Sequence, residues 1–167
     1  TLSSSSAASD VYKRQSLSDS FAQNQSRKMR KAEEAFSLEK YTDAIELYKK
    51  AYKKTKNRSL KAEIIFKQGE CYRMSSRIKQ AQIYYKRAIK SKYPDVIVYL
   101  RYADVLRMLG DLDEAVIQYK KYIQLNPNDV RGEMGLKSCN FALKWKDLPT
   151  RYNAVSYTHL TLPTKRI

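Results

Sequence analysis

Acidic and basic residues that could bind a charged partner recur at a regular spacing in this chain. Glu33, Glu70 and Asp104 are separated by 37 and 34 residues, and Arg73 and Arg107 each follow an acid by three positions. Three positions are close to one helical turn, so each arginine would lie beside its acid on one helix face. Arginine holds carboxylates through paired hydrogen bonds and can also donate to backbone carbonyls. The spacing therefore predicts a recurring acid–arginine pair on one helix face, which could bind a charged partner.

Catalytic chemistry is not indicated by the sequence. The chain has one histidine, His159, and it has no Gly-rich phosphate loop and no Gly-x-Ser-x-Gly motif. Cys71 and Cys139 are the only cysteines, and two cysteines fall short of the four Cys or His ligands of an ordinary zinc site. We therefore predict that the protein is not an enzyme and that it uses no cofactor and no metal.

The composition indicates helices as the elements that position these residues. The 167 residues include only four glycines and four prolines, which disfavours sandwiches, barrels and disordered linkers. The formal net charge is +16. No run of about eighteen apolar residues is present, so we expect no transmembrane segment in this fragment.

The two ends of the chain differ from the rest. One stretch of DNA, read on its two strands, can encode both SSAASDVYKRQ and VSYTHLTLPT, and that DNA resembles a transposon-derived sequencing adapter. We expect residues 1–15 and 154–167 to be translated adapter, the alternative being two genuine tails. Residues 16–22 are either the remnant of a signal peptide, ending at Ala22, or a polar lead-in to a helix, and residues 149–153 would begin a linker to a downstream region.

Three segments of the chain repeat one pattern. Ala44, Ala81 and Ala115 are spaced by 37 and 34 residues, and a tyrosine follows each alanine by four positions: Tyr48, Tyr85 and Tyr119. Upstream of each alanine a small residue recurs, at Ala32, Gly69 and Ala103. An alanine lets two helices of a hairpin approach closely, and the large residue one turn later fills the gap between neighbouring hairpins. Gly110 is placed to end a helix, and Asp111 or Asp113 to cap the next one.

These positions resemble the tetratricopeptide repeat (TPR) family, whose period is 34 residues. The resemblance implies an all-α TPR solenoid with three helix-turn-helix repeats at about 25–58, 62–95 and 96–129 within residues 23–129, followed by a C-terminal capping helix over 130–148. Trp145 would then pack back on the apolar face of that helix. Cys71 and Cys139 fall at equivalent positions two repeats apart, beyond the roughly 7 Å Cα separation that a disulfide allows, so we expect buried free thiols.

The resemblance also implies a peptide-binding groove along the concave face, lined by the first helix of each repeat. The family's groove positions correspond to Met29, Glu33, Phe36, Phe66, Glu70, Arg73, Met74, Leu100, Asp104, Arg107 and Met108. This mixture suits an extended or helical peptide. The alternative is a solvated face whose charges pair with one another. Met29 and Glu33 stand where the carboxylate-clamp subfamily has Lys and Asn, which disfavours chaperone C-terminal peptides as ligands. We expect Arg73 and Arg107 to be exposed.

Basic residues gather on the second helix of each repeat. They form what we call the basic ridge: Lys49, Lys50, Lys53, Lys86, Arg87, Lys90, Lys120 and Lys121. One interpretation is a solubilising surface, and the other is contact with an anionic surface such as nucleic acid or phospholipid headgroups. No nucleic-acid-binding motif accompanies the ridge, which disfavours nucleic acid as a partner.

These features together predict a non-enzymatic protein-interaction scaffold that binds a protein or peptide in the TPR groove. FAQNQ near the start, and LKSCNFALKW with PTRYN near the end, resemble the N-terminal TPR region of exported bacterial envelope proteins with an OmpA-like domain, some of which are associated with type IX secretion. That resemblance implies a periplasmic or outer-membrane-associated protein, with possible peptidoglycan association through a downstream domain. The alternative is a cytoplasmic TPR adaptor.

Overall fold

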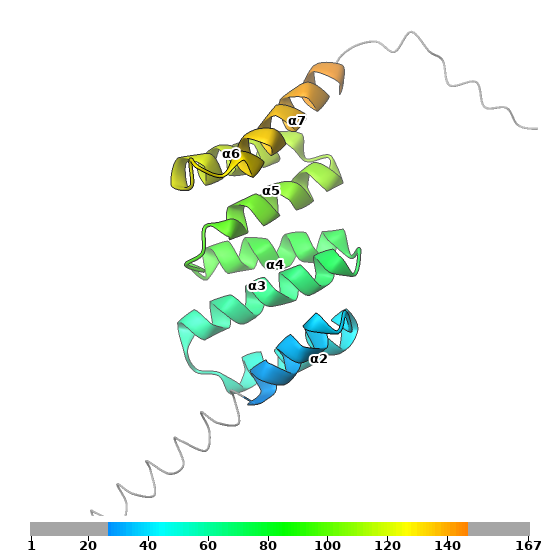
Figure 1. The fold of residues 1–167 in the computed structure, drawn as a ribbon, viewed down its shortest axis with the longest axis vertical. Coiled ribbons are helices and arrows are strands. Elements are labelled where there is room, and N and C mark those ends of the chain that lie inside the picture. The colour runs from blue at the N-terminus through cyan, green and yellow to red at the C-terminus, as the bar shows by residue number, and fades with distance from the viewer. Residues whose placement is uncertain (1–26, 147–167) are drawn as a thin grey trace, which may run out of the picture.

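The helices of this protein stack in chain order, as Figure 1 shows. The structure is a computed structural model, and it describes residues 27–146. A helical segment over residues 27–37 is followed by α2 (Tyr41–Lys54), α3 (Arg58–Met74), α4 (Ile78–Lys90), α5 (Ile97–Leu109), α6 (Leu112–Leu125) and α7 (Val130–Lys146). The prediction of an all-α solenoid of helical hairpins is confirmed for this part of the chain. The expected adapter tails, the signal-peptide remnant 16–22 and the linker 149–153 lie outside the described residues.

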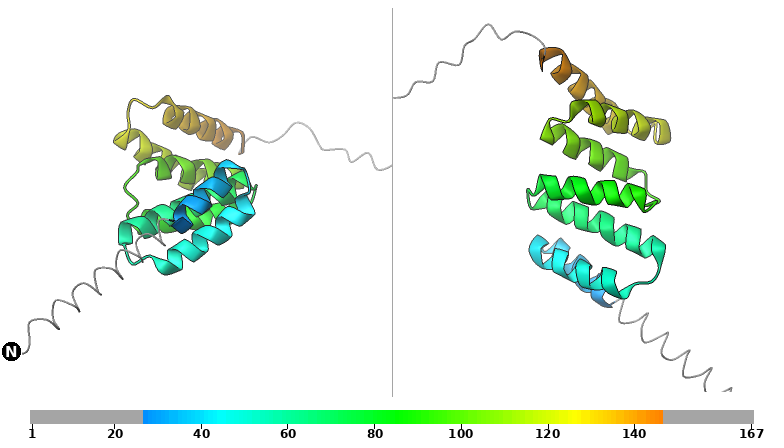
Figure 2. Two further views of the ribbon diagram at one scale, coloured as in Figure 1. Left: turned by 60° about the horizontal axis from the view of Figure 1, so that its bottom comes forward. Right: turned by 180° about the vertical axis from the view of Figure 1, so that it is seen from behind.

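The repeated alanines lie where the helices of each hairpin touch. Ala81 in α4 is fully buried, as are Ala44 and Ala115 at the equivalent positions of α2 and α6. Tyr85, one turn after Ala81, is also fully buried, and its ring lies against Gly69 of α3. A Cβ atom on Gly69 would stand 2.8 Å from the Tyr85 ring, so only glycine allows this approach. The views in Figure 2 show the successive hairpins stacked along one axis.

The hairpin turns share one backbone conformation but not one residue type. Gly110 ends α5 with φ 84°, as the sequence predicts, and Glu39 and Ser76 hold φ 58° and 60° at the equivalent turns. The predicted aspartate cap is wrong, because Asp111 occupies the N-cap of α6 without a capping hydrogen bond. Its carboxylate instead accepts a hydrogen bond from the Gln82 amide of α4 at 3.3 Å.

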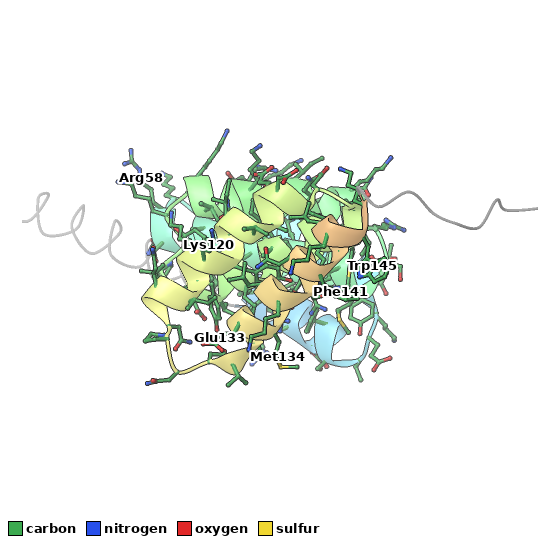
Figure 3. The ribbon with its side chains drawn as sticks, turned by 90° about the horizontal axis from the view of Figure 1, so that it is seen from above. Arg58, Lys120, Glu133, Met134, Phe141 and Trp145 are labelled. Atoms are coloured by element: carbon green, nitrogen blue, oxygen red, sulfur yellow. The ribbon has the colours of Figure 1, made fainter. Side chains whose placement is uncertain are left out.

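The α7 helix packs on α6 and α5 through its small residues. Gly132 and Cys139 are its buried residues. Trp145 was predicted to pack back on the apolar face of this helix; it contacts Phe141 of α7, with 5.8 Å between the ring centroids, but both rings are exposed, so this contact is not a buried one (Figure 3). Six positions separate Trp145 from Cys139, which rotates its side chain away from the buried face. Cys71 and Cys139 are buried free thiols, as predicted.

Candidate functional site

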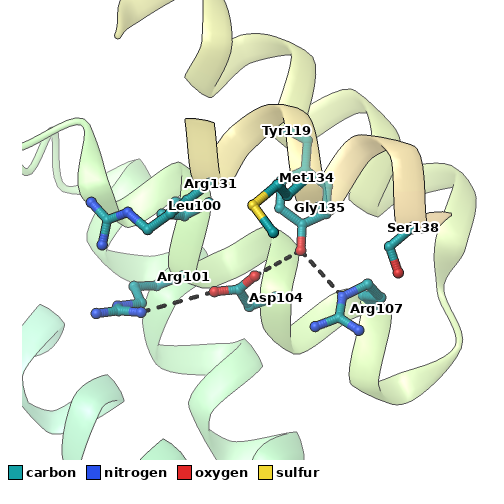
Figure 4. Close-up of a pocket in the computed structure, with 9 residues that line it drawn as sticks. All are labelled: Leu100, Arg101, Asp104, Arg107, Tyr119, Arg131, Met134, Gly135 and Ser138. Carbon is teal, nitrogen blue, oxygen red and sulfur yellow. Dashed lines mark hydrogen bonds and ion pairs between the residues drawn. The ribbon is translucent and has the colours of Figure 1, made fainter. Parts of the chain in front are cut away.

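A pocket of about 320 Å³ opens between α5 and α7 (Figure 4). Three of the predicted groove residues line it: Leu100, Asp104 and Arg107. The other lining residues come from α5, α6 and α7 and were not among the predicted ones: Arg101, Tyr119, Arg131, Met134, Gly135 and Ser138. We call this space the groove pocket. The α7 helix, expected only to cap the stack, therefore forms one wall of it.

The apolar residues predicted for the groove divide into core and surface. Met29 and Phe66 are 9% and 7% exposed and belong to the hydrophobic core, so they offer little surface to a ligand. The Phe66 ring packs against Tyr85 and Tyr93, with 5.8 and 4.6 Å between the ring centroids. Leu100 is likewise buried but borders the groove pocket, and Phe36 is half-buried against Tyr41. The two predicted methionines are exposed, at Met74 and Met108.

Glu70 is bound into a network within its own repeat. Its carboxylate accepts hydrogen bonds from the Tyr85 hydroxyl of α4 and from Arg73, the latter at 2.8 Å. Arg101 of α5 approaches the same carboxylate at 3.5 Å. The side chain of Glu70 is only 12% exposed and that of Arg73 22%. Arg73 is therefore half-buried and paired, contrary to the expectation of an exposed and available guanidinium.

Asp104 repeats this arrangement in the next hairpin. Its Oδ1 accepts a hydrogen bond of 2.7 Å from the Tyr119 hydroxyl, and Arg107 Nε donates to the same hydroxyl at 3.4 Å, as the dashed lines in Figure 4 show. Arg101 Nη1 lies 3.9 Å from Asp104 Oδ2. Burial raises the pKa of Tyr119 above its ordinary range, which keeps its hydroxyl protonated as a donor. Arg107 is also half-buried, so the expectation that it is exposed is wrong too.

Arg101 is one of the site residues that the sequence reasoning missed. It lies between Glu70 and Asp104 and links the two repeats electrostatically. A signal for it was present, because Arg30, Lys67 and Arg101 recur with the same 37- and 34-residue spacing as the acids. A basic residue three positions before each acid could therefore have been added to the predicted site.

The first repeat lacks this network. Glu33 is exposed, and the described residues include no hydrogen-bond partner for it. Tyr48 stands where Tyr85 and Tyr119 stand, but its buried hydroxyl has no hydrogen-bond partner within residues 27–146. Phe36 occupies the position of Arg73 and Arg107. The polar part of the groove is thus built from α3 to α7 rather than along all three repeats.

The groove pocket is lined by more cations than carboxylates. Arg101, Arg107 and Arg131 line it, against the single carboxylate of Asp104. Arg131 is also paired at the start of α7 with Asp129, 2.5 Å away. Because Asp104 already accepts from Tyr119, the donors left over in the lining belong to the guanidinium groups and to the hydroxyl of Ser138. Met134, 66% exposed, adds an apolar contact at the rim.

The basic ridge lies on a different side of the stack, on α2, α4 and α6. All eight of its residues are exposed. Half of them line a second pocket, of about 250 Å³, which we call the ridge pocket: Lys49, Lys50, Lys53 and Arg87. Among the described residues, no three His, Cys, Asp or Glu side chains gather as metal ligands. No helix in that same part of the chain is long and apolar enough to cross a membrane.

Known proteins resemble this chain in both sequence and fold. A family model described as "Tetratricopeptide repeat" matches residues 29–92 and 66–130. The human protein O-mannosyl-transferase TMTC2 (Homo sapiens) is 28% identical over 87 residues, which cover 52% of this chain. The chain spans only 10% of the length of that relative.

Solved structures share the fold at low sequence identity. The first TPR of Spaghetti (RPAP3), bound to the HSP90 peptide SRMEEVD, has a TM-score of 0.66 at 20% identity, covering 73% of this chain and 94% of that chain. The Sgt2 TPR domain from Aspergillus fumigatus has a TM-score of 0.64 at 15% identity, covering 82% and 92%. The Hsp90 co-chaperone Cns1 from Saccharomyces cerevisiae has a TM-score of 0.68 at 16% identity, covering 75% and 41%. Because the family model spans most of the described stack, the chain belongs to the tetratricopeptide repeat family.

Proposed function

We propose that this protein is a non-enzymatic interaction scaffold that binds an extended peptide along α3, α5 and α7. The observation that carries the proposal is the groove pocket, where three arginines face one carboxylate that is already hydrogen-bonded. A peptide carboxylate placed there would receive donors from Arg107 and Arg131. Exposed Met74, Met108 and Met134 would contact apolar side chains on either side of it, since methionine adapts to varied shapes.

The ligand differs from the chaperone peptides named for some structural neighbours. The fold alone is shared with those proteins, at 15–20% identity. Met29 is buried here and Glu33 is acidic, so the first repeat would repel rather than clamp a terminal carboxylate. The arginines of the groove pocket lie at the opposite end of the stack. We therefore propose an internal acidic residue flanked by apolar residues as the recognised feature.

The test is peptide selection on the immobilised chain from a random phage library, followed by affinity measurements on synthetic peptides. The Arg107→Gln/Arg131→Gln variant is expected to weaken the selected peptides by roughly tenfold or more, because two charge-assisted hydrogen bonds are lost. The matched control is Lys120→Gln/Lys121→Gln, which removes the same charge from the basic ridge. Selection of peptides without acids, or an equal loss in the control, would overturn the proposal.

We also propose that the chain is the N-terminal part of a longer bacterial envelope protein. This rests on the resemblance of FAQNQ, LKSCNFALKW and PTRYN to exported TPR proteins. Its test is the full-length gene, which is expected to encode an apolar signal segment upstream and an OmpA-like domain downstream. A gene that encodes neither the signal segment nor the OmpA-like domain would contradict this proposal and favour a cytoplasmic TPR adaptor.

A further inference from the structure

The ridge pocket lies between the outer helices α2 and α4, with α3 as its floor. Its lining residues come from all three helices: Glu46, Lys49, Lys50, Tyr52, Lys53, Gln68, Tyr84 and Arg87. The groove pocket is formed by α5, α6 and α7, so the two pockets share no residue. A ligand of the ridge pocket would therefore be separate from the peptide proposed for the groove.

The charges around the ridge pocket are unbalanced. Four cations line it against one carboxylate, that of Glu46. Lys49 pairs with Glu46 at 2.8 Å, whereas Lys50 and Lys53 have no ion-pair partner among the described residues. A hydrogen bond from Lys49 lowers the pKa of Glu46, and the charges of Lys50 and Lys53 lower it further. The ammonium groups therefore make the electrostatic potential of this small region positive, and a positive potential attracts an anion.

Gln68 gives the ridge pocket a buried polar floor. Its side chain is 3% exposed, yet within residues 27–146 no group hydrogen-bonds to its carboxamide. At the same position of the next repeat, Tyr102 donates to Glu114 at 2.8 Å. The carboxamide is not among the buried polar atoms that lack a partner, so its atoms reach the space of the ridge pocket and are free to bind a ligand there.

Two tyrosine rings form part of the walls. Arg87 lies over the ring of Tyr84, at 5.1 Å from its centroid, and Lys61 lies over Tyr52 at 5.3 Å. These cation–π contacts place the positive charges next to the tyrosine rings, so the apolar faces of the rings lie beside the charges. A ligand with both an anionic head and an organic part would use both kinds of surface.

We propose that the ridge pocket binds the phosphate group of a phosphate ester. A phosphate monoester carries close to two negative charges and three acceptor oxygens, which suits Lys50, Lys53 and Arg87 better than a single carboxylate charge does. The Gln68 amide supplies a further donor from below, and the organic part lies against Tyr52 and Tyr84. The ester is either a free small molecule or a lipid headgroup, which share this chemistry.

The experiment is titration of the isotope-labelled full chain with phenyl phosphate, followed by NMR. Saturable shifts are expected at the side-chain amide of Gln68, a signal that ligand bound only in the groove pocket would not move. The Lys50→Gln/Lys53→Gln variant is expected to bind roughly tenfold more weakly. The matched control, Lys86→Gln/Lys90→Gln, removes the same charge from exposed ridge positions outside the pocket and is expected to change affinity by less than about twofold.

Gln68→Leu separates binding from folding. It is expected to weaken phenyl phosphate binding severalfold without lowering the melting temperature, because it removes an amide that has no hydrogen-bond partner among the described residues and keeps a side chain of similar size. Equal losses in the two lysine variants, or an unmoved Gln68 amide at saturation, would overturn the site. Displacement of phenyl phosphate by phosphatidic acid vesicles, and not by phosphatidylcholine vesicles, would identify a lipid headgroup as the source. No displacement by either would identify free phosphate esters.

Discussion

Replacing Glu70 by glutamine is the sharpest test of the network between the second and third repeats. The carboxylate is 12% exposed, binds the Tyr85 hydroxyl and Arg73, and lies 3.5 Å from Arg101. Glutamine keeps one acceptor for Tyr85 but leaves Arg73 without its anion and leaves Arg101 with Asp104, 3.9 Å away, as its remaining carboxylate. A hydrogen bond to a charged group contributes about 1.5–3 kcal/mol, and the partial exposure of Arg73 reduces the electrostatic part. We expect Glu70→Gln to lower the free energy of unfolding by about 2–3 kcal/mol.

The matched control is Glu33→Gln, because Glu33 occupies the same position in the first repeat but is exposed and outside the network. The Glu33→Gln substitution is expected to lower the free energy of unfolding by about 0.5 kcal/mol or less. Urea unfolding followed by far-ultraviolet circular dichroism measures both variants. A double-mutant cycle with Tyr85→Phe should give a coupling energy within about 0.5–3 kcal/mol. Equal losses in Glu70→Gln and Glu33→Gln, or a coupling near zero, would refute the network.

Three further predictions test the stack, its tyrosines and its ends. Ala81→Arg should lower the free energy of unfolding by about 3–5 kcal/mol, because it overpacks a fully buried helix contact and buries a charge. Lys86→Glu, at an exposed position, should lower it by about 0.5 kcal/mol or less, and urea unfolding measures both variants. Burial raises the pKa of Tyr85 and Tyr119 above 10.0, so the free energy of unfolding should stay level up to about pH 10. Above that pH the unfolded state loses phenolic protons first, and stability should fall by roughly 1.4 kcal/mol per pH unit for each tyrosine; a level profile there would contradict the burial. A chain trimmed to residues 23–153 should keep the thermal midpoint of the full chain in a circular dichroism melt, and a fall of more than a few degrees would show that the ends contribute to packing.

The fold could be predicted because its signal is repeated. A fully buried alanine and tyrosine recur in each hairpin, and their spacing alone identifies the helix pairs. The turns could be predicted only in part. The glycine at position 110 indicates a left-handed backbone conformation, but Glu39 and Ser76 adopt the same conformation although they are not glycines. Tertiary packing of the hairpin imposes that backbone, and no local residue preference indicates it.

The candidate site was harder to predict because position in a repeat does not determine exposure. Met29, Phe66 and Leu100 hold a groove position and are buried, whereas Met134, at the same position of α7, is 66% exposed. The acids and arginines were found by their spacing, but their mutual pairing depends on side-chain reach across helices. Gln68 carried no signal at all, since a lone glutamine in a helix is an ordinary surface residue.

The tyrosine rings that lie on glycines have a consequence for the shape of the molecule. Tyr85 rests on Gly69 within one hairpin, and Tyr119 rests on Gly135 between one hairpin and α7. Each ring acts as a spacer of fixed thickness between two backbones, and a solenoid repeats such spacings along its axis. Each contact limits how closely its two helices approach, so a methyl group added at Gly135, closer to the Tyr119 ring than van der Waals contact allows, would open the angle between α6 and α7. The groove pocket would change width even though no arginine in it had been altered.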